Sequence, residues 1–269
     1  MIMGYEPEDQ RKLVYKNSTV TYYIKGNREG KTIFMLHPAF ADHTIFNHQT
    51  DYFKDKYQII TLDMPGHGQN QFKGSTITIN ETPEIIHHIL AENGIKACHL
   101  IGVSLGSLVA QSFADRYPHQ AESVTIVGGY SIHKANEHIL KAQRKEGLKW
   151  ILYILFSMKK FRNYVTSVSC HTSQGRELFN RGIQHFTRRS FPAMSGMNAL
   201  FTKKDTHVPY PLLIITGEHD IKLAQDAAVE MHALEKHSHI VHLSGAGHCA
   251  NVDTPREFNS VVDDFLLKN

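Results

Sequence analysis

The sequence predicts an α/β protein whose central sheet is mostly parallel and carries helices on both faces. Short apolar runs of strand length alternate along the chain with longer segments in which apolar residues recur at helical spacing. Several runs are mainly apolar, as in parallel strands that are buried on both faces. The 269 residues, 41% hydrophobic and 20% charged, are enough for one domain with a sizeable core.

The expected strands follow one another from the start of the chain. A hairpin comes first, because two β-rich runs flank the turn-forming pair Asn17-Ser18. The later runs end at polar or small residues, for example at Asp63. The expected strands cover residues 13–15, 20–24, 32–36, 58–62, 97–101, 124–127, 212–216 and 240–243.

Helices are expected between these strands. One begins with Thr82 as its capping residue, followed by a proline, and stops at Asn93-Gly94. The last helix begins with a spacing from Thr254 to Glu257 that is typical of a capping box. Two further helices are expected at 105–117 and 223–234.

Residues 131–205 interrupt the alternation. They are basic, aromatic and helix-like. They hold 14 of the 29 Lys and Arg residues but only four of the 26 Asp and Glu residues, a net charge of +10 against −7 for the rest. We expect a core of residues 1–130 and 206–269 with an insertion at 131–205. The charge of this insertion is either solvated or attracts anionic substrates or lipids.

Composition argues against several classes of protein. No nucleic-acid-binding motif accompanies the basic residues, so no nucleic-acid partner is expected. The 19 histidines lack partners at zinc-site spacing, so no metal is expected. The longest apolar run, 150–156, is too short for a membrane span, which needs ~20 residues. Three widely spaced cysteines, and no signal-peptide pattern in residues 1–10, favour a cytoplasmic protein. No feature specifies an oligomeric state.

The sharpest chemical signal is the Gly-x-Ser-x-Gly pattern at residues 102–106. It follows an expected strand and opens an expected helix, which is the context of a nucleophile elbow. Its two glycines leave room for a tight strand–helix crossing, and the helix N-terminus favours negative charge. Ser104 is therefore the expected nucleophile, and the alternative is an ordinary helix-capping serine.

A serine hydroxyl is a weak nucleophile and needs an adjacent base. His248 is the candidate, because it ends the glycine-containing turn 244–248 directly after an expected strand. These glycines allow the imidazole to turn back over the sheet. The alternative is a surface loop histidine, since the chain has 19 histidines. The position of His248 in the order of motifs favours its interpretation as the base.

The base needs a carboxylate that fixes its tautomer and stabilises the imidazolium. Asp220 follows the expected strand 212–216 and gives the chain order serine, aspartate, histidine, which is the order expected for this architecture. Glu218 and Asp226 compete for this role. The turn 128–130 contains no carboxylate, which excludes an acid there.

Acyl transfer also needs hydrogen-bond donors for the oxyanion. One is the backbone N–H of Leu105, the residue after the nucleophile, and the other is expected from the turn 37–43. All these turns follow strands, and ligands of such sheets bind at the carboxyl ends of the strands.

Five motifs together resemble the α/β-hydrolase superfamily. They are Leu36-His37-Pro38-Ala39, Asp63-Met64-Pro65-Gly66-His67-Gly68, Gly102–Gly106, Gly217-Glu218-His219-Asp220 and Gly245-Ala246-Gly247-His248. The chain is similar to the esterase, enol-lactone hydrolase and carbon–carbon bond hydrolase branches, except at 131–205. The resemblance implies the α/β-hydrolase fold, a helical cap (lid) at 131–205 that supplies substrate contacts, and a structural turn at 63–68.

The resemblance also bears on single residues. The family usually has glycine where Pro38 stands. Because proline has no N–H and a fixed φ, the second oxyanion donor is expected to be Ala39, beside Leu105. The following cap residues either line an apolar acyl pocket or pack the cap onto the sheet: Trp150, Ile151, Tyr153, Ile154, Leu155, Phe156 and Met158.

The sequence thus predicts a serine hydrolase that cleaves an ester-like bond of a small, partly apolar substrate. Ser104, His248 and Asp220 act through an acyl-enzyme without a cofactor. A carbon–carbon bond hydrolase or a perhydrolase-like enzyme is an alternative on the same triad. A slow-turnover ligand sensor that signals to a protein partner is an alternative of another class. Epoxide hydrolases and dehalogenases need a carboxylate at position 104, which disfavours them.

Overall fold

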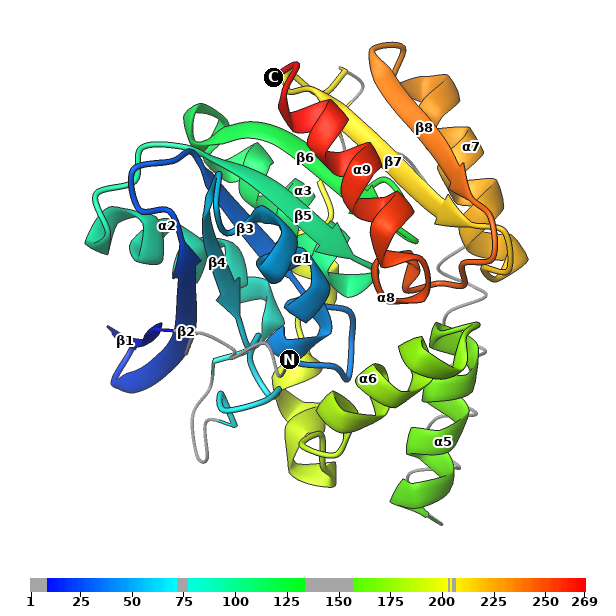
Figure 1. The fold of residues 1–269 in the computed structure, drawn as a ribbon. Helices are drawn as coiled ribbons and strands as arrows, with labels where there is room; N and C mark the ends of the chain where they lie inside the picture. The colour runs from blue at the N-terminus through cyan, green and yellow to red at the C-terminus, as the bar shows by residue number, and fades with distance from the viewer. Residues whose placement is uncertain (1–8, 72–76, 134–156, 203, 205–206) are drawn as a thin grey trace, which may run out of the picture.

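The computed structural model describes residues 9–71, 77–133, 157–202, 204 and 207–269. Its eight described strands form one sheet in the order β1-β2-β4-β3-β5-β6-β7-β8 (Figure 1). β2 is antiparallel to both of its neighbours, and all other neighbouring strands are parallel. The strands are β1 (Asp9–Tyr15), β2 (Ser18–Gly26), β3 (Thr32–Leu36), β4 (Gln58–Leu62), β5 (Cys98–Val103), β6 (Ala121–Val127), β7 (Leu212–Gly217) and β8 (Ser238–Leu243).

The central strands are buried over their whole length. Every residue of β3, β4, β5 and β7 is buried. This explains why continuous apolar runs predicted them, and β3 and β4 agree with the prediction residue for residue. The opening hairpin is confirmed, but it turns at Lys16-Asn17, one residue earlier than expected. Both turn residues have positive φ, 44° and 61°, as hairpin turns of the type I′ kind require.

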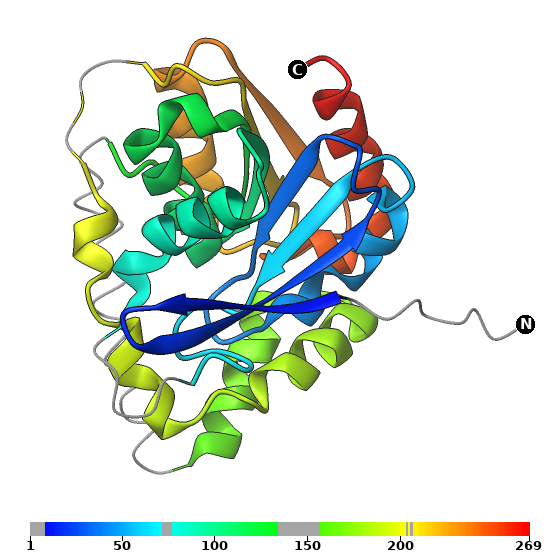
Figure 2. The same ribbon diagram turned by 90° about the vertical axis from the view of Figure 1, so that its left-hand side faces the viewer.

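Helices cover both faces of the sheet (Figure 2). α2, α3 and α7 contribute to the hydrophobic cluster on one face, and α1 and α9 contribute to the cluster on the other. The predicted fold class, a mostly parallel sheet between layers of helices, is therefore confirmed. The α-helices are α1 (Asn47–Phe53), α2 (Thr82–Glu92), α3 (Leu105–Arg116), α5 (Met158–Ser169), α6 (Ser173–Ile183), α7 (Lys222–Leu234), α8 (Ala250–Asp253) and α9 (Pro255–Leu266). The short 3-10 helices are η1 (His43–Phe46), η2 (Ile79–Glu81), η3 (Pro118–Gln120), η4 (Arg188–Met194) and η5 (Met197–Leu200).

One predicted helix cap was wrong, and a second was right in position only. The hydroxyl of Thr82 donates to the Ile79 carbonyl instead of capping α2, and a capping box at Thr78 begins the 3-10 turn that leads into this helix. Thr254 is the N-cap residue of α9, as predicted, but its hydroxyl donates to the Ala250 carbonyl and makes no capping hydrogen bond. In both cases a preceding helical turn offers a carbonyl acceptor that the linear pattern does not reveal.

Residues 157–202 lie beyond the carboxyl ends of the parallel strands, where α5 and α6 are seen in Figure 1. They form the helices α5, α6, η4 and η5 and contain no strand. Within the described part of the chain, no helix is long and apolar enough to cross a membrane.

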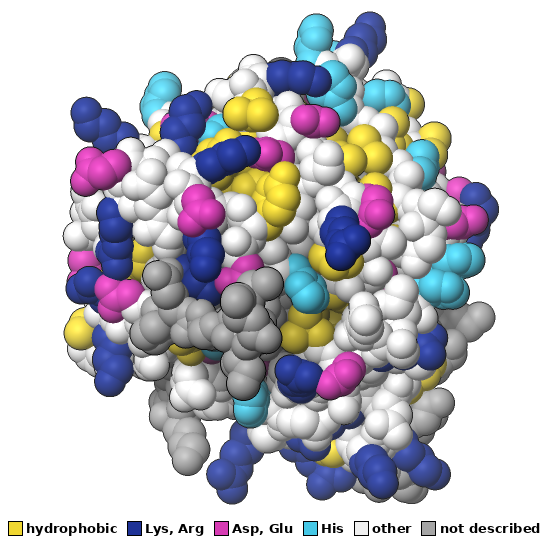
Figure 3. Space-filling view, in the orientation of Figure 1, with side chains coloured by type: hydrophobic (Ala, Val, Ile, Leu, Met, Phe, Trp, Pro, Cys, Tyr) yellow, Lys and Arg dark blue, Asp and Glu magenta, His cyan; other side chains and the backbone are white. Residues whose placement is uncertain are grey.

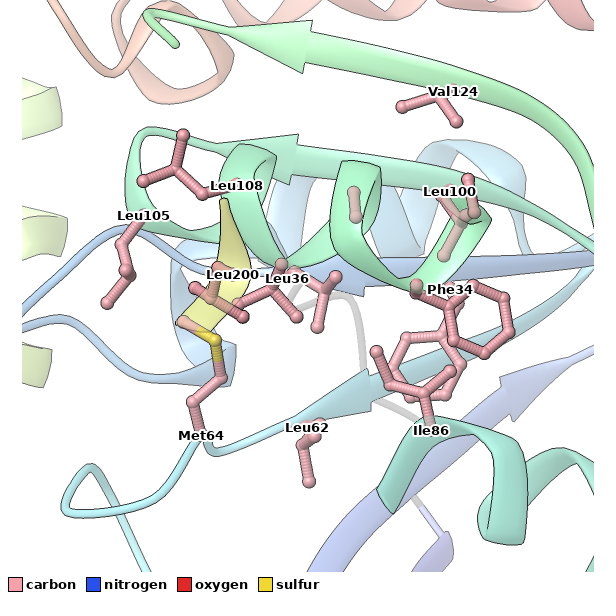
Figure 4. Packing of buried hydrophobic residues seen from close by; sticks show 14 of the residues in the cluster. Phe34, Leu36, Leu62, Met64, Ile86, Leu100, Leu105, Leu108, Val124 and Leu200 are labelled. Carbon is pink, nitrogen blue, oxygen red and sulfur yellow. The ribbon is translucent and has the colours of Figure 1, made fainter. Parts of the chain in front are cut away.

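The core beneath α2 and α3 should tolerate truncation poorly. Phe34 of β3 is fully buried in a cluster with Ile86 and Leu100 (Figure 4). Phe34→Ala is expected to lower the free energy of unfolding by about 3–5 kcal/mol, because it removes apolar contacts and leaves a cavity. Urea denaturation of the purified variant measures this. Val229→Ala, at a 55% exposed position of α7, is the control and should change stability little.

Candidate active site

Ser104 occupies a strained turn between β5 and α3. Its φ is 51° and its ψ −112°, a backbone conformation that residues with a side chain rarely adopt. Its N–H donates to the Val127 carbonyl at the end of β6, at 2.8 Å. Strain of this kind persists only where surrounding contacts hold it, and it is often found at functional sites. The half-buried Ser104 therefore has the backbone geometry expected of a nucleophile elbow.

The two glycines of the motif allow the backbones to come into contact. A Cβ atom on Gly102 would lie 2.4 Å from the carbonyl oxygen of Gly106. A Cβ atom on Gly106 would lie 2.1 Å from the carbonyl oxygen of Leu36. The first turn of α3 thus rests directly on the end of β3, next to the turn that begins at His37.

The structure brings Asp220 and His248 together. Nδ1 of His248 lies 2.7 Å from Oδ1 of Asp220, which follows β7. The same Asp220 oxygen accepts the N–H of Ile221 at 2.7 Å, so the carboxylate is fixed in place. The imidazole also lies against the end of β6, since a Cβ atom on Gly128 would be 2.8 Å from Nδ1 of His248. With Nδ1 bound to the acid, Nε2 is the ring nitrogen available to accept a proton.

The environment of His248 makes it a stronger base. Burial alone would lower its pKa, but the charge and the hydrogen bond of Asp220 outweigh burial, so the pKa of His248 lies above its ordinary value. The side chain of Asp220 is fully buried and that of His248 is 16% exposed. Their attraction is consequently little screened by water.

The two competing acids have other partners. Glu218 accepts hydrogen bonds from the Ser244 hydroxyl at 2.7 Å and from the Gly245 N–H at 2.9 Å. It therefore holds the turn that leads to His248. Asp226 is half exposed and pairs with Lys222 one turn earlier on α7. Among the described contacts, neither acid reaches the imidazole.

Asp253 supports the site and was not found from the sequence. Its carboxylate accepts the N–H of Gly247, immediately before His248, at 2.8 Å. It also accepts the N–H groups of His171 and Thr172, both at 2.8 Å, and the Thr172 hydroxyl at 2.7 Å. One buried carboxylate thus joins the loop of the candidate base to the turn between α5 and α6. No local pattern signals this role, because its partners are mainly backbone groups from a distant segment.

A second connection links the same two regions. The N–H of Cys249 donates to the Ser169 carbonyl at 2.8 Å. The ring of His171 stacks on that of His219 with 3.7 Å between centroids, and His219 directly precedes Asp220. The turn between α5 and α6 therefore contacts the loops of both Asp220 and His248.

The two expected oxyanion donors lie on neighbouring segments. Leu105 is the first residue of α3, and Ala39 lies in the turn after β3. The contact between Gly106 and Leu36 brings these segments together. Ala39 is followed by Phe40, whose positive φ of 73° shows that the turn bends sharply despite Pro38.

The ring of Phe40 packs against the helical segment. Its centroid lies 5.2 Å from that of Phe161, 4.9 Å from that of Phe186 and 6.3 Å from that of Phe191. These phenylalanines form an aromatic cluster between the turn after β3 and residues 157–202. Of the expected pocket residues, Met158 is half-buried and packs against this core. The others, Trp150, Ile151, Tyr153, Ile154, Leu155 and Phe156, lie outside the described residues.

Comparison with known proteins identifies the fold in which this geometry occurs. A family model described as "alpha/beta hydrolase fold" matches residues 31–151. The chain has the α/β-hydrolase fold and resembles the α/β-hydrolase superfamily. This α/β hydrolase is 22% identical, over 93% of its length and 95% of the relative's, to an (E)-2-((N-methylformamido)methylene)succinate hydrolase of Acinetobacter baylyi.

Two further proteins illustrate the range of the similarity. A 2-hydroxy-6-oxononadienedioate/2-hydroxy-6-oxononatrienedioate hydrolase of a Pseudomonas species is 24% identical, with 94% of this chain and 93% of that protein covered. The solved structure of the enol-lactonase from Burkholderia xenovorans has a TM-score of 0.80 at 16% identity, with 96% and 100% of the two chains covered. The chain is accordingly an α/β-fold hydrolase.

The contact between Asp220 and His248 predicts a shift in the pH dependence of the enzyme. The base works only when neutral, so activity should rise through a pKa above the ordinary value for histidine. Asp220→Asn removes the charge, which lowers this pKa and moves the rising limb of kcat/KM to lower pH. The rate should also fall by orders of magnitude, because the tautomer is no longer fixed. Initial rates on a p-nitrophenyl ester from pH 5 to 9 measure both effects.

Asp226→Asn is the matched control, since Asp226 is a surface carboxylate on α7. It should leave both the rate and the pH profile unchanged. An inactive Asp226→Asn variant beside a fully active Asp220→Asn variant would show that the acid has been assigned to the wrong residue.

Proposed function

We propose that this α/β hydrolase is a serine hydrolase that cleaves an ester-like bond through an acyl-enzyme. The observation that carries the proposal is the buried hydrogen bond between Asp220 and His248, at the end of the sheet where Ser104 adopts its strained conformation. The proposed nucleophile, base and acid follow three parallel strands of the same sheet, β5, β8 and β7, and so lie at the carboxyl ends of these strands.

The reaction follows from these positions. His248 accepts the hydroxyl proton of Ser104 as Oγ attacks the substrate carbonyl. The N–H groups of Ala39 and Leu105 stabilise the oxyanion of the tetrahedral intermediate. His248 then gives the proton to the leaving group, and an acyl-enzyme remains on Ser104. A water molecule, deprotonated by His248, attacks this ester and releases the acid, which restores the enzyme without a cofactor.

We also propose that residues 131–205 form a cap over a core of residues 1–130 and 206–269. The described part of this segment supports it, because α5, α6 and η4 lie beyond the carboxyl ends of the strands. The aromatic cluster around Phe40 packs this segment against the turn that contains Ala39. We propose that the substrate has an apolar part, in keeping with the expectation from the sequence.

The positive net charge of residues 131–205 supports the proposal of an anionic substrate. Lys and Arg side chains gather at the end of the molecule that contains α5 and α6 (Figure 3). Arg188 and Arg189 are exposed on η4, and Phe191 of the same helix packs on Phe40. The two relatives described above are named for a substituted succinate and for a dienedioate, both of which carry two carboxylates. We therefore propose that the substrate bears a carboxylate.

A carbon–carbon bond hydrolase is the second candidate, because the Pseudomonas relative is named for such a dienedioate substrate. A panel of esters, lactones and 2-hydroxy-6-oxo dienoic acids separates the two reactions. The third candidate, a ligand sensor with slow turnover, would show negligible hydrolysis together with tight ligand binding.

We further propose that the protein is cytoplasmic. All three cysteines, Cys98, Cys170 and Cys249, are free and buried. Such thiols persist most readily in a reducing compartment.

Ser104→Ala is expected to reduce ester hydrolysis by roughly 10⁴-fold or more while the fold is retained, because the nucleophile is lost and alanine is small enough for the elbow. A fluorophosphonate probe should label the wild type and not the variant. Ser112→Ala is the control, since Ser112 is a buried serine further along α3. Labelling that persists in Ser104→Ala would overturn the assignment.

The proposed anionic substrate predicts a salt effect. Electrostatic attraction is screened beyond ~8 Å at physiological ionic strength, so kcat/KM for a carboxylate-bearing ester should fall as salt rises. A neutral ester of matched shape should show a flatter profile. Replacing Arg188 and Arg189 by glutamate should reduce the difference between the two esters. Identical, flat profiles in the wild type would mean that the basic residues only solvate the cap.

A further inference from the structure

α3 carries a stripe of polar side chains along one side. Ser107, Gln111 and Asp115 follow Ser104 at intervals of three or four residues, so they lie on the same side of the helix that begins at the proposed nucleophile. The hydroxyl of Ser107 donates to the Ser104 carbonyl at 2.5 Å. Gln111 and Asp115 lie one and two turns further along α3. They bind the two segments through which the chain enters and leaves residues 131–205.

The entry segment, residues 128–133, is held to α3 by its backbone. It begins against the imidazole of His248. The side-chain amide of Gln111 donates to the Tyr130 carbonyl at 2.9 Å and accepts the N–H of Ile132 at 3.2 Å. Gln111 is completely buried. The entry segment therefore follows α3 away from the candidate base, and a buried side chain fixes its path.

The exit segment, residues 200–204, also reaches the start of α3. Leu200 is completely buried in the cluster that contains Leu105, whose N–H is a proposed oxyanion donor (Figure 4). The N–H groups of Thr202 and Lys204 donate to carbonyls of the entry segment at 3.1 Å and 3.3 Å. The entry and exit segments therefore lie side by side and are joined by backbone hydrogen bonds.

Asp115 binds both segments with one carboxylate. Its Oδ2 lies 2.8 Å from Nε2 of His133, in the entry segment, and accepts the hydroxyl of Thr202, in the exit segment, at 2.6 Å. Its Oδ1 lies 2.9 Å from Nζ of Lys204, also in the exit segment. The side chain of Asp115 is only 5% exposed and that of His133 is 1% exposed. Water therefore screens these contacts little.

The carboxylate stays ionised wherever the enzyme would work. Burial alone would raise the pKa of Asp115, but the hydrogen bonds from His133, Thr202 and Lys204 lower it to about 2. Hydrogen bonds to an ionised group are roughly twice as strong as those between neutral groups. A single charged side chain of α3 thus joins the two ends of the inserted segment.

We infer that Asp115 is a positioning residue for the cap: it anchors both ends of residues 131–205 to α3, the helix that begins at Ser104, and so holds the cap in a fixed place relative to the nucleophile. The inference rests on the proposed function, because it treats Ser104 as the nucleophile and residues 131–205 as a cap. Asp115 itself is roughly 16 Å from Ser104 along the helix axis, too far to touch the reacting atoms. It acts through the cap, so a substrate that extends to the cap depends on it and a short substrate does not.

Three substitutions test the inference. Asp115→Ala removes the acceptor of all three donors. Thr202→Val removes one donor and keeps the shape of the side chain, so its effect should have the same direction and a smaller size. Asp263→Ala is the matched control. Asp263 of α9 is also a buried carboxylate, and it binds Nζ of Lys56 at 2.8 Å and the Tyr52 hydroxyl at 3.3 Å, both outside residues 131–205.

Steady-state kinetics on p-nitrophenyl esters of two acyl lengths is the first measurement. The acetate needs only the space beside Ser104, whereas the octanoate, or the longest acyl chain that the wild type cleaves, extends towards the cap. Asp115→Ala should raise KM for the long ester roughly 3- to 30-fold, the range in which distant residues change the coupling between sites. The reason is that a cap without its anchor must be ordered when the substrate binds. Both KM and kcat for the acetate should change little.

Hydrogen exchange at the Thr202 amide is the second measurement, and it does not depend on catalysis. This N–H donates to the Ile132 carbonyl and so reports whether the entry and exit segments stay paired. It should exchange much faster in Asp115→Ala than in the wild type. Asp263→Ala should lose stability, but it should keep the wild-type exchange at Thr202 and treat both esters as the wild type does. If Asp115→Ala does not fold, Thr202→Val replaces it in both measurements.

The outcomes separate the two claims. A wild-type KM for the long ester in the folded variant would overturn the inference, as would unchanged protection of the Thr202 amide. An equal rise of KM in Asp263→Ala would also overturn it, because a general loss of stability would then explain the effect. Absence of ester hydrolysis in the wild type, or hydrolysis that persists in Ser104→Ala, would instead overturn the proposed function. In that case the exchange measurement still decides whether Asp115 holds the two segments together.

Discussion

The contact between backbones at the crossing of β5, α3 and β3 is the constraint on which the rest of the site depends. With no side chain on Gly102 or Gly106, the start of α3 lies against the carbonyl of Leu36. This closeness sets the tight turn at Ser104 and places the turn after β3 beside the first N–H of the helix. The proposed nucleophile and the proposed oxyanion donors are thus held relative to each other by close main-chain packing.

Buried polar groups then hold the surrounding loops. Asp63 accepts hydrogen bonds from the backbone and ring of His43 and from the N–H of Gln69. Burial alone would raise the pKa of Asp63, but its bonds with His43 hold it well below the usual range. Asp253 has the same task on the other side of the site. These two carboxylates order backbone segments around the candidate site.

The sequence predicted the parts of the fold whose signal is local. Runs such as 32–36 and 58–62 are mainly apolar, so their burial in a parallel sheet could be inferred. The elbow and the two turns at Asp220 and His248 were recognisable because each directly follows such a run. α1 escaped prediction because its residues Asn47–Phe53 are mostly polar and its buried side chains include Gln49 and Thr50.

The role of Asp253 could not be predicted for a different reason. Most of its partners are backbone N–H groups of other segments, and every residue type except proline supplies an N–H. No spacing or composition records such a bond. The same holds for the hydroxyls of Thr82 and Thr254, which each donate to a carbonyl of the preceding turn instead of capping a helix.

The hydrogen bonds of Asp253 also bear on how such a protein can be re-engineered. Exchanging the helical segment between relatives is an obvious route to new substrate ranges, and residues 131–205 suggest the ends of the exchanged piece. Yet the Ser169–Thr172 stretch is bound to the loop of His248 through Asp253 and Cys249. A graft that replaces this stretch would also remove contacts that support His248, the candidate base. An exchange of α5 and α6 should therefore keep the native residues 169–172 between them.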